Sequence, residues 1–210
     1  MTDNSIADPA LALNSRRATV AQVAILAALA STGTLATNIL LPSLPQIGRS
    51  LDVSTATVTS SITVFLAAFA IGQLAVGPIS DRYGRYLPVV TGFIVFIVGS
   101  IWCGLAADLP NLLFGRAVQA FGACATSVLS RAIARDMFSG EALARTLALI
   151  MIAMAAAPGF SPLLGGALDR YFGWRSEFVF VAIFSAVAAA AYATQLGETH
   201  RGVRTPLAPR

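Results

Sequence analysis

The sequence is poor in the residues that carry most enzymatic and metal chemistry. Among its 210 residues there is a single histidine, His200, and the two cysteines, Cys103 and Cys124, both fall inside apolar segments. With no further histidine or cysteine at ligand spacing, we expect neither a zinc site nor a disulfide framework. No acid pair and no nucleophile with a neighbouring base lies inside an apolar run, which argues against an enzyme with catalytic residues or a resident cofactor.

Charge is also scarce, and its basic part is of one kind. Only 11% of the residues are charged, lysine is absent, and all 14 basic residues are arginines spread over loops and chain ends. Because a nucleic-acid surface needs its basic residues gathered in a patch, nucleic acid is not an expected partner. We interpret the net charge of +4 as a determinant of membrane topology.

What the sequence has in abundance is apolar residues in long runs. Hydrophobic residues make up 56% of the chain and the mean hydropathy is +0.74, which is typical of a membrane protein. A run of about 20 residues can cross a hydrocarbon core of roughly 30 Å, and backbone that faces lipid must be helical. We expect an all-α membrane protein with six transmembrane helices, near residues 20–41, 56–77, 87–107, 111–133, 145–167 and 177–196.

The arginines predict the orientation of this bundle. The six runs occupy residues 20–196, between an N-terminal tail at 1–19 and a C-terminal tail, or the start of a linker, at 197–210. With the N-terminus inside, the cytoplasmic segments hold most of the arginines, which by the positive-inside rule places both tails in the cytoplasm. The cytoplasmic arginines are Arg16, Arg17, Arg82, Arg85, Arg131, Arg135, Arg145, Arg201, Arg204 and Arg210, and the outer ones are Arg49, Arg170 and Arg175.

Two short charged stretches between the runs share a pattern. Gly77 to Arg85 reads G-P-I-S-D-R-Y-G-R, and Gly165 to Arg175 reads G-G-A-L-D-R-Y-F-G-W-R, so Gly-x-x-x-Asp-Arg-Tyr recurs 88 residues later. The first copy would lie on the inside and the second on the outside. This arrangement is typical of two inverted three-helix repeats, a feature of secondary transporters.

The first of these stretches, residues 77–85, is called the latch below. Gly77 and Gly84 permit a close or left-handed backbone. Asp81 can accept hydrogen bonds from helix N-termini or from guanidinium groups, and Arg82 and Arg85 supply positive charge. The alternative is a plain surface hairpin whose arginines only mark the cytoplasmic side.

The remaining arginine, Arg116, lies inside the fourth predicted span. A charged side chain in the middle of a bilayer costs about 2.5–3.5 kcal/mol or more, so we expect Arg116 to face the bundle interior or a water-filled cavity. Gln119, three residues further on, can share that face. The alternative is an arginine that snorkels to the interface, since Pro110 is close by.

The fifth run contains A-P-G-F-S-P-L-L-G-G at residues 157–166. Its prolines, Pro158 and Pro162, would bend the helix, and its small residues, Gly165 and Gly166 among them, would let another helix approach closely. Ordinary small-residue packing is the alternative interpretation.

Together, five short sequences resemble one group of transporters. They are L-P-S-L-P at 41–45, the latch, G-R-A-V-Q at 115–119, the fifth-run stretch, and G-W-R at 173–175. In this order, and over nearly all of residues 20–196, they resemble the drug/proton antiporters of the major facilitator superfamily that are related to bicyclomycin and chloramphenicol resistance proteins (Bcr/CflA).

The resemblance implies a fold, an activity and roles for these residues. The chain would be the N-terminal six-helix half of a proton-coupled multidrug efflux transporter of a bacterial-type inner membrane, with the lipid bilayer around it and a small, moderately hydrophobic molecule as substrate. Asp81 would help to lock one end closed against the other half; without that half, it would pair with arginines such as Arg82, Arg131 or Arg135. Arg116 would lie in a cavity and take part in proton exchange, with Gln119 beside it, and the fifth-run prolines and glycines would form an antiporter motif that bounds the cavity.

One departure from the group concerns proton coupling. Ser31, Thr34 and Asn38 form a polar stripe on the first span, and Asn38 stands where many relatives have an aspartate. An amide cannot carry a proton. None of the acids lies clearly within a predicted span; they are Asp3, Asp8, Asp52, Asp81, Asp108, Asp136, Glu141, Asp169, Glu177 and Glu198.

Length is the second departure, because transporters of this kind contain two six-helix bundles, about 400 residues in all. Three explanations stay open: a fragment or truncated frame, a half-transporter that pairs with a second copy or another half, and an inactive remnant. A different class of function, a non-transporting bundle that scaffolds a partner, also stays open. Four apolar side chains can either line a cavity for the substrate or pack against neighbouring residues: Phe65, Phe69, Phe121 and Met154.

Overall fold

The computed structural model describes residues 19–196, and the predictions for the tails at 1–18 and 197–210 lie outside it. Within the described residues the chain is helical and contains no strand. Six helices are long and apolar enough to cross a membrane, which confirms the predicted fold class. The elements are α2 (Val20–Asn38), η1 (Leu41–Ser43), α3 (Leu44–Ser50), α4 (Thr55–Tyr83), α5 (Tyr86–Leu105), α6 (Leu109–Met137), α7 (Gly140–Phe172) and α8 (Arg175–Gln195).

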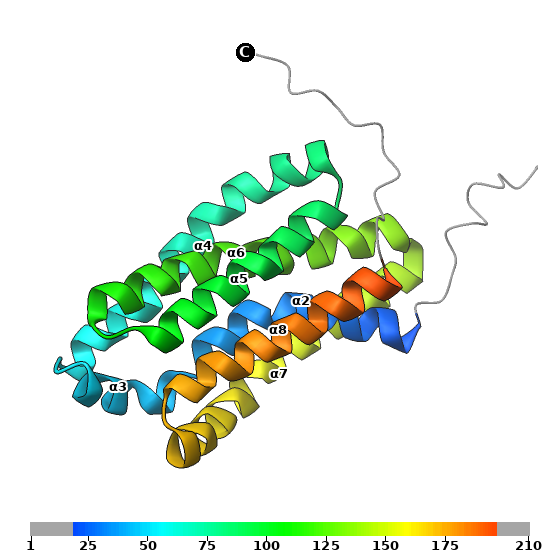
Figure 1. Cartoon of the computed structure of the whole chain (residues 1–210). Helices are drawn as coiled ribbons and strands as arrows, with labels where there is room; N and C mark the ends of the chain where they lie inside the picture. The colour runs from blue at the N-terminus through cyan, green and yellow to red at the C-terminus, as the bar shows by residue number, and fades with distance from the viewer. Residues whose placement is uncertain (1–18, 197–210) are drawn as a thin grey trace, which may run out of the picture.

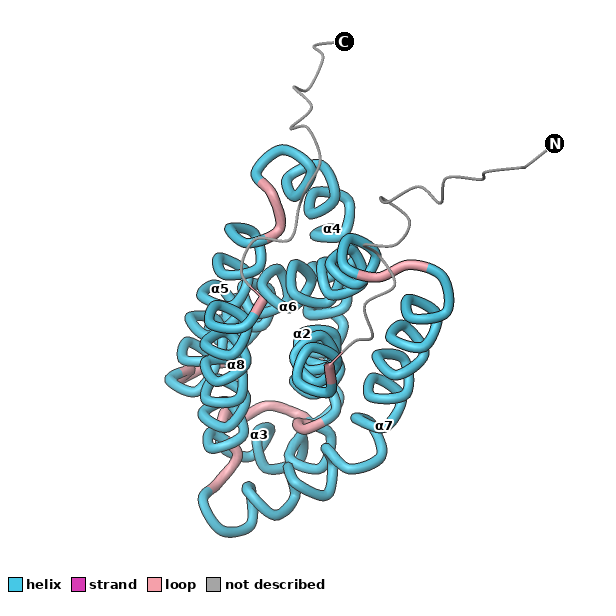
Figure 2. The backbone as a smooth tube through the Cα atoms, turned by 90° about the vertical axis from the view of Figure 1, so that its right-hand side faces the viewer, coloured by secondary structure: helices cyan, strands magenta, loops and turns pink. Residues whose placement is uncertain are grey.

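The long helices run up and down along one bundle axis, with short turns between consecutive helices (Figure 1). Seen along the bundle, α2 lies in the middle, with α7 on one side and α8 on the other (Figure 2). It packs against α6, α7 and α8, whereas α4 and α5 pack chiefly on α6, and α5 also packs on α8. Helix α2, the first helix in the described part of the chain, is therefore the central helix of the bundle.

Several helices extend beyond the apolar runs that predicted them. The second span was predicted at 56–77, but α4 continues to Tyr83, and α7 exceeds its predicted range of 145–167 at both ends. The extra turns contain charged residues, such as Arg82 in α4 and Arg170 in α7, so hydropathy does not mark them. N-cap residues do mark the starts of α4 and α6. The side chain of Ser54 accepts a hydrogen bond from the backbone N–H of Thr57, and that of Asp108 accepts one from the backbone N–H of Asn111.

Helices α5 and α6 approach each other unusually closely through glycines. A Cβ on Gly99 of α5 would lie 2.4 Å from the backbone nitrogen of Gln119, and a Cβ on Gly122 of α6 would lie 2.3 Å from that of Phe96. Small residues at helix contacts are how membrane helices gain van der Waals packing in the absence of a hydrophobic driving force. This close contact brings the backbones of α5 and α6 together next to Arg116.

The two copies of the repeated pattern occupy equivalent positions. Each ends a long helix, α4 at Tyr83 and α7 at Phe172, and each is followed by a glycine with positive φ, Gly84 at 83° and Gly173 at 78°. Only glycine adopts this backbone freely, so it ends the helix sharply. Because α4 and α7 run in opposite directions, the copies lie at opposite ends of the bundle (Figure 1), as inverted three-helix repeats require.

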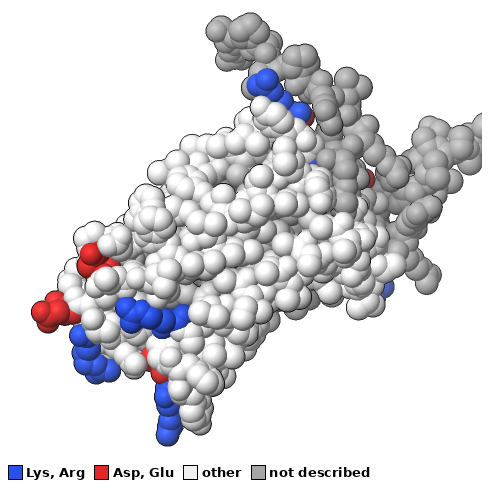
Figure 3. Space-filling view, viewed as in Figure 1, with Lys and Arg blue, Asp and Glu red and all other residues white. Residues whose placement is uncertain are grey.

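Charges gather at the two ends of the bundle and leave a white, uncharged band between them (Figure 3). One end, with the α4–α5 and α6–α7 turns, is called the latch end; it holds Arg82, Arg85 and Arg135. The other, with α3 and the α5–α6 and α7–α8 turns, is called the α3 end. Within the described residues, the predicted inner and outer groups of arginines thus lie at opposite ends of the molecule.

Substitution of Gly122 by alanine should destabilise the bundle, because the new methyl group would meet backbone atoms that no rotamer change can move. Overpacking of this kind costs about 1–3 kcal/mol of unfolding free energy. The matched control is Gly159→Ala in α7, where a Cβ would meet nothing within 4 Å. Unfolding of both variants in detergent checks this, and equal stability of the two would contradict the close α5–α6 contact.

Candidate functional site

Arg116 lies at the centre of the bundle. It is in the second turn of α6, which begins under the Asp108 cap, and its side chain has no exposed surface. The guanidinium lies 4.2 Å from the ring centroid of Phe65 on α4. Its Nη1 donates to the carbonyl oxygen of Ala36 on α2 at 3.2 Å and to Oε1 of Gln119 at 2.5 Å. The interior-facing prediction is confirmed, and the snorkelling alternative is wrong.

Gln119 links this arginine to a third helix. While its carbonyl oxygen accepts from Arg116, its Nε2 donates to Oγ of Ser100 on α5 at 2.8 Å, and that hydroxyl donates to the carbonyl oxygen of Phe96. The close approach at Gly99 is what brings α5 within reach of the Gln119 side chain. The chain of hydrogen bonds orients Gln119 so that its oxygen, the only atom of the amide that can accept, faces the guanidinium.

The arginine is nevertheless not fully satisfied. Its Nε and Nη2 are buried and have no hydrogen-bond partner among the described residues. Its partners are neutral: a carbonyl, an amide and an aromatic ring. A buried cation without a paired anion is costly and is seldom retained for structure alone. The site therefore offers two donor nitrogens and a positive charge to a group that enters the interior.

The polar stripe on α2 is where the sequence predicted it. Asn38, Thr34 and Ser31 are all half-buried, on the side of α2 that is less covered than its Leu35 and Ala36. The Nδ2 of Asn38 donates to the carbonyl oxygen of Thr34 at 2.8 Å. No hydrogen bond among the described residues joins Asn38 to Arg116; the contact from α2 to Arg116 comes from the Ala36 carbonyl instead.

The latch differs from the predicted loop. Residues 77–83 are the last turns of α4, and only Gly84 and Arg85 form the connection to α5. Asp81 and Arg85 are four residues apart, and Gly84, which ends α4, lies between them. Gly84 has the left-handed backbone that was expected, but Gly77 has no neighbour within 4 Å of a Cβ position, so its smallness serves no contact among the described residues.

Asp81 pairs with a different arginine from those expected. Arg82, Arg131 and Arg135 were the predicted partners, but the carboxylate of Asp81 accepts from Nη1 of Arg85 at 3.1 Å. The Nε of Arg85 also donates to Asp136 at the end of α6, at 2.9 Å. Arg82 instead lies over the ring of Tyr83. Because Arg85 lies between Gly84 and the start of α5, it is the arginine that reaches both acids.

The fifth-run motif is only partly an interface. The buried positions of α7 in this stretch are Ala157, Ser161 and Gly165, spaced one turn apart, and a Cβ on Gly165 would lie 1.9 Å from the carbonyl oxygen of Ile39 at the end of α2. Pro158 is exposed and Pro162 and Gly166 are partly exposed. The contact with α2 thus depends on a ridge of small residues, and the prolines lie beside it.

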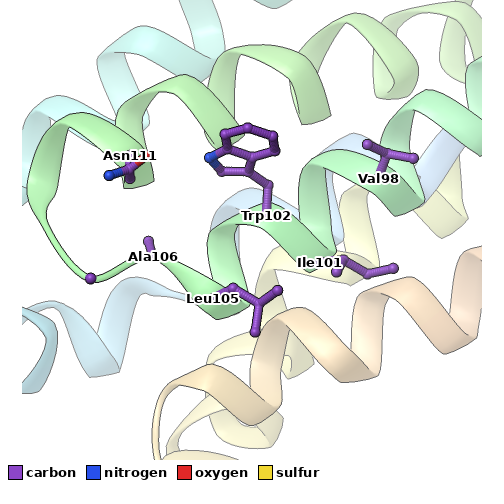
Figure 4. Close-up of a pocket in the computed structure, with 7 residues that line it drawn as sticks. Val98, Ile101, Trp102, Leu105, Ala106 and Asn111 are labelled. Carbon is purple, nitrogen blue, oxygen red and sulfur yellow. The ribbon is translucent and has the colours of Figure 1, made fainter.

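A shallow hollow of about 440 Å³ on the outside of the bundle is not part of this site. Trp102 and Asn111 line it together with aliphatic side chains such as Leu105 (Figure 4). It lies at the end of α5 and the start of α6, away from α2 and α7, and Arg116 is not in its lining. Its apolar surface is of the kind that faces lipid.

Sequence reasoning missed one buried acid. Glu177 was set aside as an acid at the edge of a span, but it lies in the first turn of α8 with no exposed surface. Ser43 of η1 donates a hydrogen bond to its Oε1. The signal was available, because Glu177 is the first residue of the apolar run predicted at 177–196.

The sequence profile of the Major Facilitator Superfamily matches residues 23–208. The chain belongs to this superfamily. Its relatives include the uncharacterised MFS-type transporter YdgK of Bacillus subtilis, 37% identical over 83% of this chain and 44% of that protein. A bicyclomycin resistance protein homologue of Haemophilus influenzae is 30% identical over 90% of this chain and 48% of that protein. This member of the superfamily therefore spans about half the length of the curated relatives that it matches.

Solved structures of the superfamily show the same fold. A crystal structure of the peptide transporter POT in complex with sulfate superposes with a TM-score of 0.78 at 14% identity, over 94% of this chain and 44% of that one. A bacterial homologue of the human lysosomal transporter Spinster superposes with a TM-score of 0.75 at 18% identity, over 91% of this chain and 46% of that one. The expected half of a major facilitator fold is confirmed, and family and fold are those of transporters.

Replacing Gln119 by leucine should weaken the bundle, because it leaves the Arg116 guanidinium and the Ser100 hydroxyl short of partners. An unsatisfied buried polar group costs about 1–3 kcal/mol. The control is Gln73→Leu on the exposed face of α4, which makes the same chemical change with no buried partner. Unfolding in detergent distinguishes them, and a Gln119→Leu protein as stable as the control would show that the network contributes nothing.

Proposed function

We propose that the chain is the N-terminal half of a proton-coupled transporter that exports small, moderately hydrophobic compounds. The drug-resistance names of several relatives support this substrate class, including the chloramphenicol resistance protein of Pseudomonas aeruginosa, 31% identical over 84% of this chain. In the complete assembly, Arg116 and Gln119 face the substrate and proton pathway, with Asn38 at its edge.

The observation that carries the proposal is the uneven burial of the helices. In the most apolar stretches of α2 and α6, 61% of residues are buried, against 17% in α4 and α7. Each of the latter helices buries one narrow stripe, such as Val58, Phe65 and Gly72 on α4, and presents apolar side chains elsewhere. Two such helices on one bundle provide an interface for a second six-helix bundle, with α2 and α6 at the back of the cavity between them.

The latch supports the same assembly. Asp81 keeps 64% of its side chain exposed although it is paired with Arg85, and Gly77 has open space above it. An acid and a glycine left uncovered at the end of α4 are suited to receive a helix of the other bundle, the glycine by close approach and Asp81 by accepting hydrogen bonds. The second bundle is a C-terminal half or a second copy of this chain.

Orientation follows from the arginines of the two ends. We place the latch end, with Arg82, Arg85 and Arg135, in the cytoplasm and the α3 end outside. The protein is then a multi-pass protein of a bacterial-type inner membrane, whose driving force is the proton gradient and which uses no cofactor.

The test is drug accumulation in cells that express the complete protein. Export should lower the intracellular concentration of a compound such as chloramphenicol, and collapse of the proton gradient should restore it. Arg116→Gln should abolish most of this export at equal expression. A membrane protein that only scaffolds a partner would leave accumulation unchanged in every case, and that result would refute the proposal.

Asp81→Asn should reduce export at least several-fold while leaving membrane insertion intact, because it removes a charge from the proposed contact between the bundles and keeps the shape. Asp52→Asn at the α3 end is the control; Asp52 has a φ of 54°, which asparagine adopts readily. Export assays at equal expression compare the two. Wild-type export by the Asp81→Asn protein would contradict a latch role.

A further inference from the structure

The buried Glu177 is a polar group that the proposed pathway around Arg116 does not use. Three elements enclose it at the α3 end: the start of α8, which carries it, η1, and the last turns of α7. Its Oε1 accepts from the Ser43 hydroxyl, while its Oε2 is buried and has no hydrogen-bond partner among the described residues. The neighbouring residues Trp174 and Phe178 are buried aromatics.

No cation compensates the Glu177 carboxylate within the described residues. The charged group that acts on it is Asp169 of α7, which has the same sign and has a buried, unpartnered Oδ1 of its own. Arg175 is two residues away, but its guanidinium lies over the Trp174 ring at 4.3 Å and donates to the carbonyl oxygen of Ala106. The other titratable groups on the neighbouring elements are Arg49, Arg170 and Tyr171, which are exposed, and the Cys103 thiol of α5.

Burial without a cation and beside another acid disfavours a carboxylate and favours the neutral acid. We propose that Glu177 binds a proton and that this is the proton that the chain exchanges. Glu177 would then serve in place of an acid at position 38, where this chain has Asn38. The second part rests on the proposed function. Ser43 and Asp169 are positioning residues, the first by its hydrogen bond and the second by its like charge.

The position of the site suggests how the proton is released. Gly165 of α7 touches the Ile39 carbonyl at the end of α2, and Ser43 follows four residues later. A shift of α7 against this segment, such as occurs when one bundle rocks on another, separates the elements that bury Glu177. Water then reaches the carboxyl group, the neutral acid gives its proton to water, and the charged form persists until the elements close again and the proton returns.

Infrared titration of the purified protein tests proton binding directly. At neutral pH, where exposed acids are ionised, we expect a carbonyl-stretch band of a protonated carboxylic acid in the wild type and in Glu141→Gln, which replaces an exposed acid at the other end of the bundle. We expect no such band in Glu177→Gln. Where Glu177→Gln fails to fold, Ser43→Ala serves instead, since loss of its hydrogen bond shifts the band. A wild-type protein without the band, or a band that Glu177→Gln retains, overturns the proposal.

A separate transport experiment tests whether this proton drives export. Reconstituted Glu177→Gln should lose proton-driven export at least tenfold and keep substrate exchange in the absence of a gradient, whereas unchanged proton-driven export would overturn its coupling role. Stabilisation of the wild type by Na⁺ that Glu177→Gln abolishes would overturn the assignment to a proton. If no variant and no wild-type protein moves any substrate, the proposed function fails, and the infrared band alone decides whether Glu177 holds a proton.

Discussion

A single cation in the bundle interior constrains the packing around it. Arg116 is fully buried, and its guanidinium is held by the Ala36 carbonyl, the Gln119 amide and the Phe65 ring, from three different helices. Each contact requires a helix at a fixed distance. The α5–α6 contact must be close enough for Ser100 to orient Gln119, and the residue that permits this is Gly99, which has no side chain to hold the helices apart. The close packing of α5 on α6 and the hydrogen bonding of the Arg116 charge thus depend on each other.

Away from Arg116, helices α4 and α7 are the least buried of the bundle. On the face seen in Figure 3, surface charge lies at the two ends, with an uncharged band between them. Helices α4 and α7 bury one stripe each, and both end in the same Gly-x-x-x-Asp-Arg-Tyr pattern with a left-handed glycine after it. The inverted repeat therefore places matching helix ends at opposite ends of the bundle.

The sequence predicted the six spans, the repeat and the interior position of Arg116, because each depends on local hydropathy, a short motif or the cost of charge in lipid. It did not predict what depends on tertiary packing. The pairing of Asp81 with Arg85 follows from an unexpectedly long α4 and a very short connection. The role of the Ala157–Ser161–Gly165 ridge follows from which side of α7 faces α2. Glu177 was assigned to an edge because hydropathy does not show that η1 folds over the start of α8.

The central claim is that this six-helix unit works against a second one. Native mass spectrometry of the assembly extracted from the membrane, with an antibody against the N-terminal tail to identify the chain, tests it most directly. The account predicts a species with two six-helix units, either one chain of about twice the 21.8 kDa given by this sequence or two copies of it. A stable 21.8 kDa monomer that exports drug by itself would contradict it.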